Sequence, residues 1–182
     1  MTAPLSKPEN VSRCTRFEIA GLWRAANDSI KRSETLVAHF TSLDAAKLIL
    51  GEFSLGLRAS TMGQAGGGIS VVFSDSQDGP LAELNWDKWQ GGEFRATTGT
   101  QLWGEKWESV RVGGSDEGKL DVVFFIAVPT VWVDVAAKVE GRPLIRIIPS
   151  LLLTEHQGHH WLQKGKIVKI YILRRDEEIV ME

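Results

Sequence analysis

The chain contains 182 residues, 43% of them hydrophobic and 24% charged, a composition typical of one soluble globular domain. Its net charge of −2 and pI near 6.1 give no general electrostatic reason to bind nucleic acid or an anionic membrane, and no apolar run is long enough for a membrane span. The single cysteine, Cys14, excludes an internal disulfide and a multi-cysteine metal cluster, and it fits a reducing compartment such as the cytoplasm.

The first part of the chain predicts an arm, a helix and a strand. Residues 1–14 hold two prolines among mixed polar residues, which predicts a flexible N-terminal arm before a single globular domain over residues 15–182. Apolar residues at three-to-four spacing predict a helix over residues 17–31. The apolar run at residues 36–38 predicts a short buried strand that ends at residues 39–41.

A second helix is expected directly after this strand. Ser42 or Thr41 can cap it, and the apolar residues that follow would form its buried face. Residues 57–60 predict a short return strand. A glycine-rich bend over residues 63–68 then leads into a second apolar strand, residues 69–73.

The middle of the chain contains the clearest buried strand. Residues 120–128 are rich in β-branched and aromatic side chains, which predicts a central strand buried on both faces. Before it, residues 81–89 predict one or two helical turns, and residues 94–112 fit a hairpin or an irregular flap. After it, residues 131–139 fit either a strand or a short helix, and residues 143–153 predict a strand broken by a proline.

The last part of the chain begins with a polar, histidine-bearing stretch, residues 154–166, which predicts a loop. Alternation over residues 167–173 then predicts a strand with Val168, Ile170 and Ile172 on one face. A final strand is expected close to the C-terminus. Several short strands with one or two early helices predict an α+β fold with mainly antiparallel sheets.

Four motifs follow one another along the chain. They are His39-Phe40-Thr41, Leu48-Ile49-Leu50-Gly51, Gly66-Gly67-Gly68-Ile69 and Asp176-Glu177-Glu178-Ile179-Val180. This order resembles the NAD-binding core of the ADP-ribosyltransferase superfamily. The resemblance implies two small sheets packed around a ligand cleft, NAD as the substrate, and transfer of ADP-ribose to a protein acceptor, with nucleic acid as a less favoured acceptor.

The resemblance also implies roles for residues of the first and third motifs. His39 and Thr41 would hold the ribose and its neighbouring groups. The bend with Gly67, Gly68 and Ser70 would lie beside the nicotinamide, because a backbone without a Cβ allows a ligand to approach closely.

Position 70 departs from the family pattern. The family often places a Tyr or Phe there to stack on the nicotinamide, whereas this chain has Ser70, and Phe73 is the nearest aromatic residue. Either Phe73 supplies the stack in a different register, or the protein is a degenerate, non-catalytic member that lacks this contact area.

The fourth motif offers two candidates for the catalytic carboxylate. In the family this Glu either directly precedes an Ile/Val run, which selects Glu178, or stands one residue earlier, which selects Glu177. We favour Glu178, because Asp176 would then complete an acid-x-Glu pair. The carboxylate would stabilise an oxocarbenium ion as nicotinamide leaves. A charged chain end kept in water is the alternative.

Other functional classes have less support in the sequence. His156 and His160 are four residues apart, but Gln157 and Gly158 between them weaken a helix, so a solvated loop is favoured over a metal site. A Gly-x-Ser-x-Gly nucleophile elbow does not occur. The competing hypothesis is a non-catalytic interaction domain of the same shape, which would bind a protein partner or sit in a larger assembly through exposed tryptophans.

Overall fold

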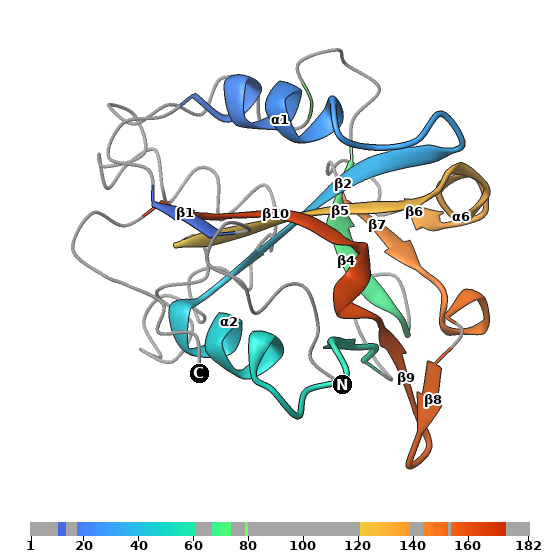
Figure 1. Cartoon of the computed structure of the whole chain (residues 1–182). Helices are drawn as coiled ribbons and strands as arrows, with labels where there is room; N and C mark the ends of the chain where they lie inside the picture. Colours follow the sequence, from blue (N-terminus) through green and yellow to red (C-terminus); the bar gives the residue numbers. More distant parts are fainter. Residues whose placement is uncertain are drawn as a thin grey trace, which may run out of the picture.

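The structure is a computed structural model, and it describes residues 11–13, 18–60, 67–73, 79, 121–138, 144–152 and 154–173 (Figure 1). Within these residues the strands are β1 (Val11–Arg13), β2 (Glu34–Thr41), β3 (Leu57–Arg58), β4 (Ile69–Val72), β5 (Val122–Pro129), β6 (Ala137–Lys138), β7 (Leu144–Ile147), β8 (Thr154–His156), β9 (His159–Leu162) and β10 (Ile167–Ile172). The helices are α1 (Ile19–Asn27), α2 (Leu43–Leu50) and α6 (Thr130–Asp134), with 3₁₀ turns at η3 (Pro149–Leu151) and η4 (Lys164–Lys166).

Most of the described strands belong to one large sheet. Seven strands pair in the order β1-β10-β5-β2-β4-β7-β6, and β3-β9-β8 form a second sheet of three strands. β1 lies parallel to β10, whereas the other neighbours are antiparallel. The mixture of many strands and few helices confirms the α+β class and the mainly antiparallel pairing predicted from the sequence.

The two longer helices lie on opposite faces of the seven-stranded sheet (Figure 1). Trp23 and its apolar neighbours on α1 pack into one hydrophobic cluster, and Ala46 with its neighbours on α2 packs into the other. We call these two sides of the sheet the α1 face and the α2 face. Helix α2 begins as predicted, because Ser42 Oγ accepts a hydrogen bond of 3.1 Å from the Ala45 amide.

Strand β5 supplies both faces with core side chains. Phe124 packs into the cluster on the α2 face and Phe125 into the cluster on the α1 face, as expected for a strand whose side chains alternate. Every residue from Val122 to Val128 is buried. The prediction of a strand buried on both faces is therefore confirmed.

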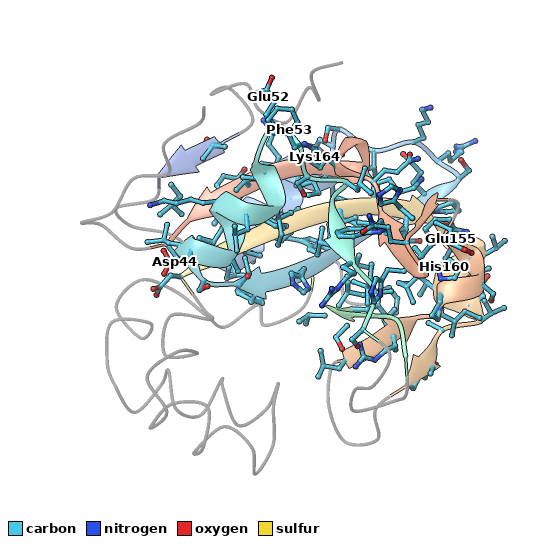
Figure 2. The ribbon with its side chains drawn as sticks, turned by 90° about the horizontal axis from the view of Figure 1, so that it is seen from below. Asp44, Glu52, Phe53, Glu155, His160 and Lys164 are labelled. Carbon is cyan, nitrogen blue, oxygen red and sulfur yellow. The ribbon has the colours of Figure 1, made fainter. Side chains whose placement is uncertain are left out.

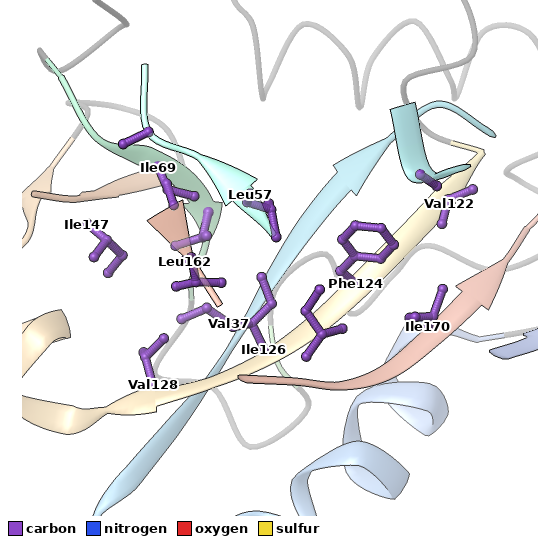
Figure 3. Packing of buried hydrophobic residues seen from close by; sticks show 14 of the residues in the cluster. Val37, Leu57, Ile69, Val122, Phe124, Ile126, Val128, Ile147, Leu162 and Ile170 are labelled. Carbon is purple, nitrogen blue, oxygen red and sulfur yellow. The ribbon is translucent and has the colours of Figure 1, made fainter. Parts of the chain in front are cut away.

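The three-stranded sheet packs over the α2 face of the large sheet. Leu57 from β3 and Leu162 from β9 meet Val37 and Ile69 of the large sheet in one cluster (Figure 3). Lys164, which follows β9, links this small sheet to helix α2. Its Nζ donates a hydrogen bond of 2.8 Å to the Gly51 carbonyl at the end of α2. The two sheets therefore enclose a shared core.

The loop expected over residues 154–166 is a β-hairpin. β8 and β9 pair directly, with His156 opposite His159. The two residues between them, Gln157 and Gly158, have φ values of 52° and 79°. Positive φ at both positions is the geometry of a tight type I′ hairpin turn, which twists in the same sense as the strands. The loop prediction was wrong because the polar side chains of residues 154–166 lack the apolar alternation by which strands are recognised in a sequence.

Two further expectations need correction. Val11–Arg13 were expected in the flexible arm, but they form β1 and pair with the last three residues of β10. Val168 was expected to share a face with Ile170, but it packs against the cluster on the α1 face while Ile170 belongs to the α2 face. A register shift between Ile167 and Lys169 reverses the alternation there.

The remaining expectations are partly tested. Residues 131–139 contain both of the forms considered, since α6 is followed by the two-residue strand β6. The strand predicted at 143–153 ends before the proline as β7. The elements expected at residues 81–89, 94–112 and the C-terminus lie outside the described residues.

Candidate functional site

His39 lies near the end of β2 with its ring on the α2 face. Its Nδ1 is 2.8 Å from the main-chain carbonyl oxygen of Ser70 on the neighbouring strand β4. A carbonyl oxygen only accepts, so Nδ1–H donates this bond, and the Nε2 of the neutral ring carries a lone pair. The ring also stacks on Phe124, with centroids 6.4 Å apart and planes at 28°. The His39 ring is thus held in one tautomer and one orientation.

Thr41 follows His39 on the same face of the strand. Residues two apart on a strand point to the same side, and Thr41 is buried where β2 pairs with the start of β5 at Val122. Helix α2 begins two residues later at Leu43. The side chains of His39 and Thr41 therefore lie on one face of the sheet, at the end of β2 and close to the first turn of α2.

The residues predicted on β4 divide between the two faces. Phe73 is half-buried and packs against the cluster on the α2 face, which is the face of His39. Ser70 alternates with Ile69 and Val71 of that cluster, so its side chain lies on the α1 face. Ser70 therefore contacts His39 only through its carbonyl oxygen.

Gly68 is required by close packing against β7. Its φ is 130°, and a Cβ at this position would overlap the carbonyl oxygen of Ile147 and press on the Arg146 side chain. Gly67 beside it is half-buried. The close approach demonstrated at Gly68 is thus between two strands, whereas contact of Gly67 with a ligand stays a prediction.

Glu177 and Glu178 lie outside the described residues, but the strand that leads to them is described. β10 ends with Ile172, which is paired with Val122 of β5, and Val122 is paired with Thr41 of β2. With neighbouring strands about 4.8 Å apart, the end of β10 lies roughly 10 Å from Thr41. β10 therefore ends at the same end of the sheet as the His-x-Thr motif.

The late histidines do not form a metal cluster among the described residues. His160 Nε2 lies 3.3 Å from Glu155 Oε2 on the opposite strand of the hairpin (Figure 2). No group of three or more His, Cys, Asp and Glu side chains capable of holding a metal occurs in the described part of the chain. The pair at Glu155 and His160 is a cross-strand ion pair when the imidazole is protonated.

The exposed apolar side chains are not the described tryptophans. Trp23 and Trp132 are buried and Trp161 is half-buried, whereas the other tryptophans lie outside the described residues. Instead, Leu48 is 77% exposed on α2. Phe53, which is labelled in Figure 2, is 92% exposed in the loop that follows α2. These two and the partly exposed Leu55 are close together in the sequence, on α2 and in the residues that follow it.

Sequence reasoning missed two buried cations, Lys164 and Arg146. Burial lowers the pKa of Lys164, an effect partly offset by the charge of Glu52. Burial likewise lowers the pKa of Arg146, which is only 5% exposed on β7. The signal for Arg146 was its place within the apolar run Leu144–Ile147, where a strand buried on both faces leaves no exposed side for a charge.

None of the described helices combines the length and the apolar character needed to cross a membrane. Comparison of the chain with protein-family models, with curated proteins and with solved structures gave no match.

Proposed function

We propose that the protein is an ADP-ribosyltransferase-like enzyme that binds NAD on the α2 face beside β2 and β4 and transfers ADP-ribose to a protein acceptor. The observation that carries the proposal is the fixed ring of His39. The hydrogen bond from Nδ1–H to a main-chain carbonyl sets the ring plane and therefore the direction in which Nε2 of the neutral ring can accept a hydrogen bond. A ribose hydroxyl is the matching donor on NAD.

The neighbouring residues support this binding mode. Thr41 has a hydroxyl on the same face as His39, suited to a second polar group of the ligand. Phe73 offers an aromatic ring on that face, suited to the flat nicotinamide in place of the aromatic residue missing at position 70. Gly67 would allow the ligand to approach the backbone closely.

The proposed reaction needs one carboxylate, Glu178 or Glu177. The bond between ribose C1′ and the nicotinamide nitrogen breaks, and its electron pair leaves with nicotinamide. The carboxylate stabilises the positive charge that develops on the ribose. The acceptor nucleophile then bonds to C1′ and loses a proton. The proposal is supported by the end of β10, which is level with Thr41, because the few residues between Ile172 and the two glutamates are enough for the chain to span that distance.

An automodification and NAD-hydrolysis assay tests the proposal. Glu178→Gln keeps the shape of the side chain and removes its charge, so it should bind NAD but turn over at least about a hundredfold more slowly, roughly 3 kcal/mol in transition-state stabilisation. Glu177→Gln is the matched control for register. If Glu177→Gln is the slow variant, the roles of the two residues are exchanged. Equal turnover of both variants and an active wild type would contradict a catalytic terminal carboxylate.

A second candidate function rests on the exposed apolar side chains of Leu48, Phe53 and Leu55. Large apolar side chains exposed within one short segment are suited to contact with a protein partner. A non-catalytic interaction domain would use these side chains and leave NAD unbound. Absence of both NAD binding and turnover in the wild type would therefore select this candidate.

A further inference from the structure

Arg146 is a buried cation that lacks a negative partner within the described residues. Its side chain is 5% exposed, and no carboxylate of the described residues forms an ion pair with it. Burial of an unpaired charge is costly, so a fold that keeps one usually provides compensation. The hydrogen bonds of Arg146 provide only part of it.

One edge of the guanidinium holds the glycine-rich segment. Nη1 donates to the Gly68 carbonyl at 3.0 Å and to Ser60 Oγ at 3.3 Å. Ser60 and Gly68 are themselves joined by a pair of main-chain hydrogen bonds. This edge therefore has a structural role, because it anchors the segment before β4 to β7.

The other edge, formed by Nε and Nη2, is not used in this way. Within the described residues Nε is buried and has no hydrogen-bond partner, and the hydrogen bonds of the guanidinium group come from Nη1 and not from Nη2. This is the edge with which arginine binds a carboxylate or phosphate group through two parallel N–H donors.

Small side chains flank Arg146 on both neighbouring strands. Its cross-strand partners are Ser70 on β4 and Ala137 on β6, and their side chains share its face of the sheet. Both are only half-buried, and Ser60 is exposed. Solvent therefore reaches the surroundings of Arg146, and the Ser70 hydroxyl is a further donor beside it.

We propose that the Nε–Nη2 edge of Arg146, together with the Ser70 hydroxyl, binds an oxyanion of a small ligand, either a phosphate or a carboxylate group. Arg146 alternates with Ile145 and Ile147 of the cluster on the α2 face, so it lies on the α1 face, away from His39. The site is thus separate from the proposed NAD site and does not depend on it.

Thermal unfolding in sodium phosphate and in sodium acetate, each at ionic strength matched with sodium chloride, tests this site. A ligand that binds only the folded state raises Tm by mass action. We expect one of the two salts to give a saturable rise of at least about 2 °C in the wild type. The salt that does so identifies the anion as phosphate or carboxylate.

Variants separate a specific site from a general salt effect. Arg146→Met has an apolar side chain of similar length and should lose the rise, whereas Arg58→Met, at an exposed arginine on β3, should keep it. Should Arg146→Met fail to fold, Ser70→Val retains the arginine, removes the hydroxyl, and should also lose most of the rise. An equal rise in the wild type and in these site variants, or no saturable rise in either salt, would overturn the proposal.

Discussion

Strands β5 and β7 are both buried, but they differ in what they bury. β5 presents only apolar side chains from Val122 to Val128, and these divide between the two hydrophobic clusters. β7 is equally buried over Leu144–Ile147, yet it holds the charged Arg146. β5 stabilises the fold by removing apolar area from water, whereas burial of the Arg146 charge in β7 lowers the stability of the fold. A buried charge that lowers stability indicates a binding role more strongly than a buried apolar side chain does.

The largest expected effect follows from placing a charge in β5. Val123→Asp puts a carboxylate in the cluster on the α1 face, beside Phe125 and Tyr171, without a basic partner in that cluster. We expect a loss of about 4 kcal/mol or more in the free energy of unfolding. Urea unfolding measures it. Val131→Asp, at a 63% exposed position of α6, is the control and should change stability by less than about 0.5 kcal/mol.

A medium effect is expected at the contact between β4 and β7. Gly68→Ala places a Cβ against the Ile147 carbonyl at a φ of 130°, so we expect a loss of about 3 kcal/mol. Gly21→Ala is the matched control, because it lies inside α1 with nothing within 4 Å of the new Cβ, and it should stabilise by about 0.5 to 1 kcal/mol. Equal effects of the two substitutions would show that β4 and β7 do not pack so closely.

The smallest effect concerns the other buried cation, Lys164. Burial lowers its pKa in the folded state below the ordinary value of 10.5, with the Glu52 charge acting in the opposite direction. Between the folded and unfolded pKa values the unfolded chain binds more protons, so this group makes stability rise with pH as the pH approaches 10.5.

Urea unfolding of the wild type and Lys164→Met across this alkaline range isolates that contribution. As the pH rises, the free energy of unfolding of the wild type should increase relative to that of Lys164→Met. A difference that stays constant, or that changes in favour of Lys164→Met, would contradict a pKa lowered by burial.

The sequence was informative where side-chain pattern and burial agree. The apolar run at 120–128 predicted a strand buried on both faces, and Ser42 or Thr41 followed by apolar residues at helical spacing predicted the start of α2. The hairpin of β8 and β9 was missed because its strands are polar, although Gln157-Gly158 was a usable signal for a tight turn. The burial of Arg146 had a usable signal in the apolar run around it, whereas the bulge beside Val168 depends on the neighbouring strand, which the local pattern does not encode.

The candidate site was predictable only in part for the same reason. The strand that carries His39 and Thr41 could be read from the sequence, but the bond from His39 to the Ser70 carbonyl requires β2 and β4 to be neighbours. These strands are separated by α2 and β3 along the chain. The face of Ser70 likewise follows from the register of β4 against β7.

Calorimetric titration with NAD tests the central claim, that the fixed ring of His39 forms part of an NAD site, most directly. The wild type should bind NAD in a saturable manner. His39→Ala should weaken binding at least tenfold while remaining folded, with about 1 kcal/mol lost from the hydrogen bond to Ser70. His159→Ala, at another half-buried histidine on a strand, should bind as the wild type does. No binding by the wild type at millimolar NAD, or equal affinities of the wild type and His39→Ala, would contradict the proposed site.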